Sequence, residues 1–319
     1  ESMRLALGTA GVLAAEALSP PHHAGRLLPT RRRAVDGEME RALEQLGLTP
    51  AAPTKRKKSS STTTTTTSTL LEFARRGHCV TRELLAEVDT EALTAIALRE
   101  AAAATAHAER VNVGDEWPFL QTFNPHRTDP KALTLARCEP LVDTACLLLD
   151  AASVQLYQTS IFHKRAGDAA TNWHSDLGTS VLDTNDFVTA WIPLQDVPEG
   201  GTGLLYAEKS HADVALAFWA STSEAADDRY ALADHGALSV GDVSWHHGWT
   251  LHSAAENDDA ADRFAFAVSY FAAARLLDSD ALATKVNDED EPSYAAWIHD
   301  FQPGDLLVDH PALPEFHPS

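Results

Sequence analysis

The spacing of apolar positions changes near residue 152, from helical steps of three and four residues to the shorter rhythm of β-strands. Before this point, Leu93, Ile96 and Ala101 share one side of a helix that is predicted to run from its N-cap Asp89 to about Glu109. A second helix is predicted over 129–150, with these residues toward the core: Leu133, Leu141, Cys146, Leu147 and Leu149. Phe73–Val80 predicts a short helix that turns into a strand at Gly77.

After residue 152, β-branched and aromatic residues gather in short runs that Gly and Pro separate. The segments predicted as strands are 154–162, 187–197, 203–206, 242–246 and 264–271. Helices first and many short strands afterwards predict a mostly β protein with flanking helices. The expected core is a double-stranded β-helix, a jelly roll of the cupin-like kind.

Residues 1–69 are expected to lie outside this fold, as a disordered leader and linker. The basic run Lys55–Lys58 leads through serines into the threonine tract Thr62–Thr67, which buries little when ordered. Only a short helix near 35–46 is expected there. Met3–Ala17 fits either a signal or transit peptide or an unstructured tail. The folded domain is therefore predicted over 70–319.

Composition and charge exclude several classes of protein. Hydrophobic residues make up 44% and charged residues 22% of the chain, as in globular proteins, and no apolar run is long enough for a membrane span. The net charge of −21 disfavours binding to nucleic acid. Three scattered cysteines predict reduced thiols. We expect an intracellular protein, with the cytoplasm favoured unless the leader directs it to an organelle or the secretory route.

The C-terminal part from about Asp278 is an acidic extension of the domain. Trp297 and Phe301 are its large aromatic residues, and they are predicted to dock it on the body. The sequence does not indicate what the extension does, and it leaves the oligomeric state open.

Candidate chemistry begins with a short motif that can chelate a metal. A His-x-Asp or His-x-Glu pattern occurs at His107-x-Glu109, His174-x-Asp176 and His211-x-Asp213. Residues i and i+2 share a face only on a strand, so the first pair, in a predicted helix, drops out. The third pair follows a Lys-Ser turn. His174 and Asp176 lie between strand-like segments and are the preferred pair.

A downstream segment completes this pattern. His246, His247 and His252 follow one another on a predicted strand and its turn, and Arg263 opens the next strand. Two imidazoles and one carboxylate leave three positions of an octahedral ion open, which suits Fe(II) that binds a co-substrate and O2. An arginine nearby can hold a carboxylate of 2-oxoglutarate by a bidentate pair. Of these three histidines, His252 is the preferred distal metal ligand because of its spacing to Arg263. His246 and His247 are its rivals.

These residues and their neighbours also resemble a known family. The matching motifs are Trp173-His174-x-Asp176, Trp191-Ile192-Pro193-Leu194, Gly201-Thr202-Gly203-Leu204-Leu205, Ser210-His211, Gly241-Asp242, His246, Leu251-His252, Asn257 and Arg263. In order and spacing they resemble the phytanoyl-CoA dioxygenase family of Fe(II)/2-oxoglutarate oxygenases. The resemblance spans about 70–275.

The resemblance implies a role for each site residue. His174, Asp176 and His252 would bind Fe(II), and Arg263 would bind the C5 carboxylate of 2-oxoglutarate. Trp191 would line the co-substrate pocket. Lys164, just past a predicted strand, is expected either to reach co-substrate or substrate or to be a surface lysine.

The sequence departs from the family pattern at two places. Ala254 stands where the family often has a serine, next to Ser253, so one hydrogen bond to 2-oxoglutarate is in question. Lys209-Ser210-His211 replaces a Gly-Ser-His loop and is expected to reshape the substrate entrance. The family's halogenases lack the metal-binding carboxylate, so Asp176 favours hydroxylation or another oxidation.

We therefore expect a dioxygenase that oxidises a C–H bond of a small molecule while 2-oxoglutarate becomes succinate and CO2. Fe(II) would be the cofactor, O2 the second co-substrate, and ascorbate the reductant in assays. The alternative is a non-catalytic jelly-roll binding or regulatory protein with a vestigial metal site. A cupin-like metalloenzyme without 2-oxoglutarate is disfavoured by Arg263.

Overall fold

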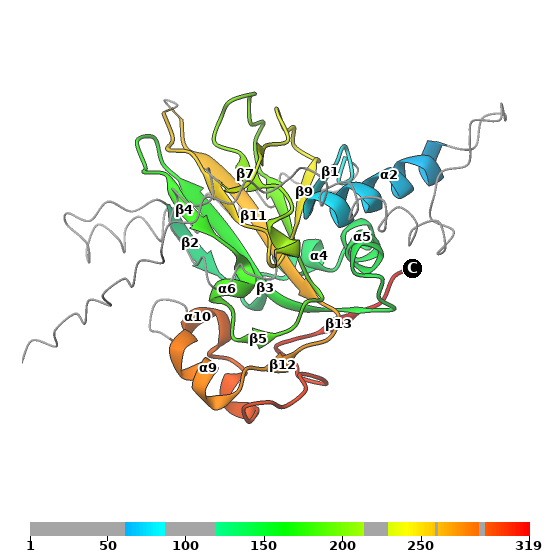
Figure 1. Ribbon diagram of the computed structural model, residues 1–319, viewed down its shortest axis with the longest axis vertical. Helices are drawn as coiled ribbons and strands as arrows, with labels where there is room; N and C mark the ends of the chain where they lie inside the picture. The colour runs from blue at the N-terminus through cyan, green and yellow to red at the C-terminus, as the bar shows by residue number, and fades with distance from the viewer. Residues whose placement is uncertain (1–60, 87–118, 214–228, 259–260, 287–290) are drawn as a thin grey trace, which may run out of the picture. The chain divides into compact units, whose positions relative to one another are not determined.

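The computed structural model of the protein describes residues 61–86, 119–213, 229–258, 261–286 and 291–319, which belong to one compact unit (Figure 1). The helices expected near 35–46 and over 89–109 lie outside these ranges. No helix of the described residues is long and apolar enough to cross a lipid bilayer.

Two antiparallel sheets build the core. Across the larger sheet the order is β1 (His78–Thr81), β9 (Val243–His247), β6 (Phe187–Pro193), β11 (Arg263–Phe271), β3 (Val154–Lys164) and β13 (Glu315–Phe316), and β2 (Leu120–Phe123) also pairs with β3. The smaller sheet has the order β4 (Thr171–His174), β10 (His252–Ala254), β7 (Leu204–Ala207) and β8 (Leu232–Ala233). A separate pair joins β5 (Leu182–Asp183) to β12 (Arg275–Leu276). All five predicted strands are present, and the jelly-roll prediction is confirmed.

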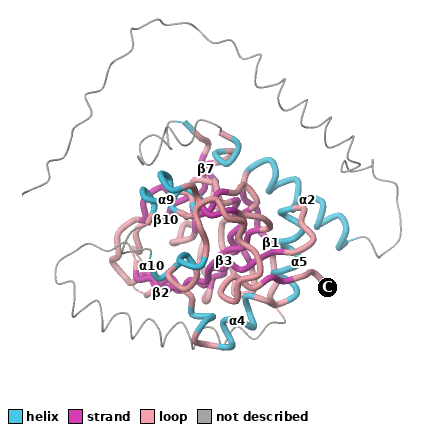
Figure 2. Tube along the Cα trace, turned by 90° about the horizontal axis from the view of Figure 1, so that it is seen from below, coloured by secondary structure: helices cyan, strands magenta, loops and turns pink. Residues whose placement is uncertain are grey.

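The helices are short, and those before β3 cover one face of the larger sheet. They are α2 (Ser61–Arg76), η1 (Pro125–Arg127), α4 (Pro130–Ala136), α5 (Glu139–Leu149), α6 (Asp176–Thr179), η2 (Ser210–Ala212), α9 (Ser279–Lys285), α10 (Glu291–Tyr294) and η3 (Ile298–Asp300). Helices α2 and α5 lie on one side of β3, and β10 lies on the other (Figure 2). The main apolar core fills the space between α5 and the sheet.

The prediction of a single helix over 129–150 is wrong. It is divided into α4 and α5, with Arg137 and Cys138 between them. Pro140 has no N–H to donate, and its ring would clash with the carbonyl of Ala136 in a continuous helix. The break changes which side of α5 faces inward: Leu141 and Cys146 are buried as predicted, but Leu148 is buried in place of Leu147.

The fold also begins earlier than Leu70. Helix α2 starts at Ser61 and includes the threonine tract that the sequence placed in the linker. A helix that has formed extends at little further cost, even through residues of modest propensity. Thr69 and Phe73 of α2 are buried, so the expectation that the chain up to residue 69 lies outside the fold is corrected at this helix.

The C-terminal extension forms part of the core, as its aromatic residues predicted. Trp297 has no exposed surface, and its ring lies 6.3 Å from that of Tyr157 and 6.2 Å from that of Phe301. Beyond it, β13 adds to the edge of β3. The extension is drawn in orange and red beneath the sheets in Figure 1.

Candidate active site

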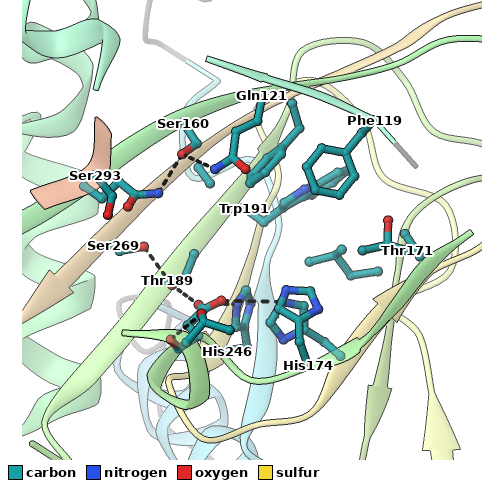
Figure 3. Close-up of a pocket in the computed structure, with 18 of the residues that line it drawn as sticks. Phe119, Gln121, Ser160, Thr171, His174, Thr189, Trp191, His246, Ser269 and Ser293 are labelled. Carbon is teal, nitrogen blue, oxygen red and sulfur yellow. Dashed lines mark hydrogen bonds and ion pairs between the residues drawn. The ribbon is translucent and has the colours of Figure 1, made fainter. Parts of the chain in front are cut away.

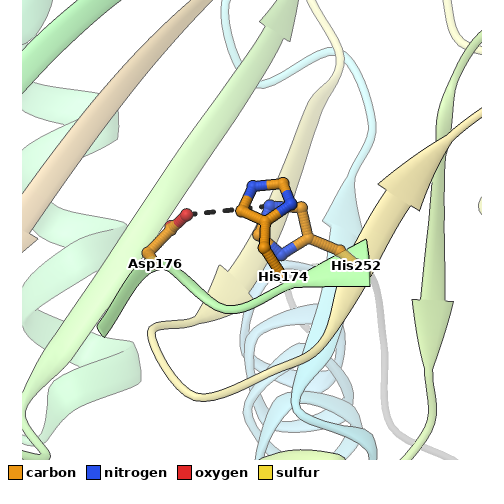
Figure 4. A group of neighbouring side chains, drawn as sticks. All are labelled: His174, Asp176 and His252. Atoms are coloured by element: carbon orange, nitrogen blue, oxygen red, sulfur yellow. Dashed lines mark ion pairs between the residues drawn. The ribbon is translucent and has the colours of Figure 1, made fainter. Parts of the chain in front are cut away.

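Three side chains with metal-binding atoms meet at the smaller sheet. His174 ends β4, Asp176 opens α6, and His252 opens β10. Because β4 and β10 are antiparallel neighbours, His174 and His252 lie directly opposite one another. One ligand atom from each of the three residues lies within 4.8 Å of the others (Figure 4), and no other such group occurs among the described residues.

Hydrogen bonds to the backbone orient both imidazole rings. His174 Nδ1 lies 2.9 Å from the carbonyl oxygen of Asn172, and His252 Nδ1 lies 3.0 Å from that of Thr250. A carbonyl only accepts, so each Nδ1 carries the hydrogen and each Nε2 presents a lone pair. Burial also lowers the pKa of His252 well below its usual value. Both rings are therefore prepared to bind a cation.

The carboxylate of Asp176 is held by two partners. Thr189 donates a hydrogen bond to Oδ2 at 2.6 Å, and His246 Nε2 lies 3.0 Å from the same oxygen. Burial alone would raise the pKa of Asp176, but the contact with His246 and the neighbouring His252 and His174 outweigh it and hold this pKa below its usual value. The other oxygen, Oδ1, lies 3.7 Å from His252 Nε2 and faces the two metal-binding rings.

The rival histidines take other positions. His246 lines the cavity and contacts Asp176 Oδ2, but it is not part of the group whose ligand atoms lie within 4.8 Å of one another. His247 points to the opposite side of β9, as strand alternation requires. Its ring lies 6.1 Å from Phe73 and 5.4 Å from His211. The structure thus brings together His174, Asp176 and His252.

A buried arginine, Arg263, lies at the end of the site away from the three candidate ligands. Arg263 has 7% of its surface exposed, and Trp191 lies under its guanidinium group, 5.3 Å from carbon to ring centroid. Its Nε donates to Thr202 Oγ1 at 3.3 Å. No described carboxylate forms an ion pair with it. Burial lowers its pKa from 12.5 to about 10, so the charge remains at neutral pH.

Lys164 adds a second positive charge at this end. It lies opposite Arg263 in the β3–β11 ladder and has no exposed surface, which excludes the surface-lysine interpretation. Its Nζ donates to Thr171 Oγ1 at 3.3 Å, and Thr171 lines the cavity while Lys164 does not. Burial and the charge of Arg263 lower the pKa of Lys164 to about 8.

One cavity of about 540 Å³ joins these features. The three candidate ligands, Trp191 and Arg263 all line it. Figure 3 labels His174 and Trp191 among them. Ala254 lines it as well and offers no hydroxyl group. Both Ala254 and Ser253 also border a neighbouring cavity of about 410 Å³. The volume is in the usual range for small-molecule sites, roughly 300–1,000 Å³.

The Lys209–His211 loop does not reshape the entrance, contrary to expectation. Neither Ser210 nor His211 lines the cavity. Instead, Ser210 Oγ accepts a hydrogen bond from the backbone N–H of Leu251 at 2.8 Å, directly before His252. The loop therefore positions the distal histidine.

Sequence reasoning missed the threonines of the site. Thr189 holds Asp176, Thr202 contacts Arg263, and Thr171 contacts Lys164. For Thr189 a signal was present, because it lies two residues before Trp191 on a strand and must share its face. Thr202 lies in a loop and Thr171 on a four-residue strand, so their contacts could not be inferred from a strand pattern.

A jelly roll that encloses two histidines, one carboxylate and a buried arginine around one cavity is the arrangement of non-haem, 2-oxoglutarate-dependent oxygenases. The family model for phytanoyl-CoA dioxygenase (PhyH) matches residues 73–265, and the chain belongs to this family. It is an Fe(II)- and 2-oxoglutarate-dependent dioxygenase, as expected, so the alternative of a non-catalytic binding protein is set aside.

Solved structures share the fold at low sequence identity. The non-haem α-ketoglutarate-dependent carbocyclase SnoK from nogalamycin biosynthesis is 19% identical, with a TM-score of 0.62 over 83% of this chain and 100% of that one. The epimerase SnoN from the same biosynthesis is 16% identical, with a TM-score of 0.61 over 79% and 99%. EctD from S. alaskensis with bound Fe is 17% identical, with a TM-score of 0.51 over 70% and 81%. A search of curated protein sequences finds no match.

Proposed function

We propose that His174, Asp176 and His252 hold the Fe(II) of this dioxygenase and that Arg263 binds the C5 carboxylate of 2-oxoglutarate. The observation that carries the proposal is the position of both groups on one cavity, with three ligand atoms within 4.8 Å of one another. The donor set fits Fe(II), since two neutral imidazoles and one carboxylate leave three positions open.

The positively charged end suits one carboxylate of a dicarboxylic acid. Thr202 occupies Nε of Arg263 and leaves the two terminal nitrogens for a bidentate pair. Trp191 supports the guanidinium face and lines the co-substrate pocket. Lys164 adds positive potential from behind Thr171. A buried cation such as Arg263, which forms no ion pair with a described carboxylate, is costly, and a bound anion offsets that cost.

Bound Fe(II) supplies the activation of O2 that the side chains lack. Overall, 2-oxoglutarate, O2 and a substrate C–H bond become succinate, CO2 and a C–OH group when the outcome is hydroxylation. The protein's own groups orient the reactants. Thr189 and His246 hold Asp176, and Arg263 aligns 2-oxoglutarate. Because Asp176 would bind Fe(II) where a halide would otherwise bind, we propose hydroxylation or a related oxidation rather than halogenation.

Succinate formation tests these roles. Purified protein with Fe(II), ascorbate and 2-oxoglutarate should form succinate slowly in air, even without a prime substrate. His174→Ala should abolish this turnover, and Arg263→Met should raise the KM for 2-oxoglutarate. His247→Ala is the matched control, because that ring lies off the cavity, and it should keep the wild-type rate. Equal succinate formation by wild type and His174→Ala would contradict the metal assignment.

A further inference from the structure

The cavity wall changes character along the larger sheet. In the β3–β11 ladder Lys164 lies opposite Arg263, whereas Gln158 lies opposite Ser269 six residues along β11. On the neighbouring strand β6, Thr189 lies opposite Ser269, and their hydroxyl oxygens are 3.0 Å apart. Since Thr189 bonds Asp176, the metal centre adjoins the Gln158 end of the wall. This end is therefore the place for the prime substrate.

Two amides and a hydroxyl form a polar shelf there, made of Gln121, Gln158 and Ser160. Ser160 Oγ accepts hydrogen bonds from Gln121 Nε2 at 3.0 Å and from Gln158 Nε2 at 2.8 Å (Figure 3). With both amino groups turned to the serine, the two amide oxygens are acceptors to which no described residue donates. All three side chains line the cavity. The shelf thus presents acceptors to a ligand that carries hydroxyl groups.

The same end lacks charge. Among the described residues that line the cavity, the permanently charged side chains are Asp176 and Arg263, which the metal and the co-substrate engage. Ser180, Ser269 and Ser293 add only neutral hydroxyl groups. A phosphate, carboxylate or ammonium group in this space would lose water without gaining a partner, which costs several kcal/mol. Acyl-CoA thioesters and free amino acids fit such a wall poorly.

Aromatic rings cover the rest of the substrate end. The rings that line it are those of Phe123, Tyr157 and Phe187, whereas Phe119 and Phe162 lie toward the Lys164–Arg263 end. Tyr157 and Phe187 meet edge to face, with centroids 5.5 Å apart. Flat apolar surfaces of this kind pack best against a rigid ring and need little ordering of the ligand.

We propose that the prime substrate is an uncharged molecule that combines a flat ring system with hydroxyl groups, such as an aromatic glycoside or a hydroxylated polycycle. Its hydroxyl groups donate to the amide oxygens of Gln121 and Gln158, and its ring packs on Tyr157 and Phe187. This inference rests on the proposed function for where the oxidised C–H bond lies, namely toward the metal centre. The chemistry of the substrate is inferred from the cavity wall.

A pair of fluorescent probes that differ in charge tests the proposal. Protein loaded with Mn(II) and 2-oxoglutarate is titrated with 4-methylumbelliferyl β-glucoside and with 4-methylumbelliferyl β-glucuronide, and binding is followed by fluorescence anisotropy. The glucoside should bind about tenfold or more tightly than the glucuronide, whose carboxylate finds no partner. Equal affinity, tighter binding of the glucuronide, or no binding of the glucoside would overturn the proposal.

Variants locate the binding to the shelf. Gln158→Leu keeps the side-chain volume and removes the acceptor, so the affinity for the glucoside should fall about threefold to tenfold. Gln302→Leu changes an exposed glutamine outside the cavity and should leave the affinity unchanged. An affinity that Gln158→Leu leaves intact would place the probe elsewhere and contradict the shelf.

Calorimetric binding of Mn(II) and 2-oxoglutarate in the same samples separates the two proposals. If both bind and the glucoside does not, the substrate class is wrong and the proposed function stands. If the glucoside binds while neither Mn(II) nor 2-oxoglutarate does, the proposed function fails and the substrate inference stands.

Discussion

Single hydrogen bonds at the metal centre decide which atoms are free to bind a cation. Backbone carbonyls hold the Nδ1 hydrogens of His174 and His252, and Thr189 holds one oxygen of Asp176. The spacing of the sequence could point to the three candidate ligands because their chemistry is in the motif itself. For Thr189 it could indicate only the strand face shared with Trp191, since the contact with Asp176 crosses from the larger sheet to α6.

Removal of the Thr189 hydroxyl should weaken metal binding without unfolding the protein. Thr189→Val keeps the shape of the side chain and frees Asp176 Oδ2 from its 2.6 Å partner. Loss of such an orienting bond typically lowers metal affinity about 10–100-fold. The measurement is Mn(II) affinity by calorimetry, with the exposed Thr284→Val as control. Unchanged affinity in Thr189→Val would show that Asp176 is oriented without it.

The affinity for 2-oxoglutarate should fall as the pH rises through about 8. Burial and Arg263 lower the pKa of Lys164 to about 8, so its positive charge is present below that pH and lost above it. Arg263 keeps its charge over this range. The affinity of the Mn(II) protein should drop about threefold to tenfold between pH ~7 and ~9.5, and Lys164→Met should remove the step. A step that persists in Lys164→Met would assign it to another group.

At the scale of elements, strand pairing joins residues that are far apart in the chain. The long strands β3, β6 and β11 were predictable because β-branched and aromatic residues fill them. The strands that carry the ligands, β4 and β10, have four and three residues and give no pattern of their own. The division between α4 and α5 depends on Pro140, which the apolar spacing alone does not reveal.

The turn between α2 and β1 admits only glycine. Gly77 has a φ of +85°, and a Cβ there would lie 2.4 Å from His211 Nδ1 and 2.5 Å from Thr250 Oγ1. Gly77→Ala should therefore lower the free energy of unfolding by about 1–3 kcal/mol for the backbone strain, and further for the clash.

Gly167→Ala provides the matched control for this turn. Gly167 has nearly the same φ, +84°, but nothing lies within 4 Å of an added Cβ. Denaturant unfolding of both variants separates strain from clash. If the two variants are equally stable, the close approach of His211 and Thr250 contributes nothing.

At the scale of the whole molecule, the two ends of the domain complete its core. Trp297 is fully buried beside Tyr157, and β13 pairs with the edge of β3. The sequence could predict that the aromatic residues dock but not where, because an acidic tail of mixed pattern does not indicate its partner strand. At the other end, Phe73 anchors α2 to the main core.

Shortened chains test how much of the N-terminal part the enzyme needs. A chain that starts at Ser61 should match the full chain in Mn(II) affinity and in denaturant unfolding. A chain that starts at Leu70 keeps Phe73 and the Arg76–Glu208 ion pair, so it should bind Mn(II) but unfold at a lower denaturant concentration. Loss of cooperative unfolding in the Ser61 chain would show that earlier residues belong to the core.

The most direct test of the central claim is the visible absorption of the anaerobic complex with Fe(II) and 2-oxoglutarate. Bidentate binding of 2-oxoglutarate to Fe(II) gives a charge-transfer band that needs both components. The wild-type protein should show this band, His252→Ala should lose it, and His246→Ala should retain it with Fe(II) affinity lowered about 10–100-fold. A band that is unaltered in His252→Ala and absent in His246→Ala would contradict the account and reassign the distal ligand.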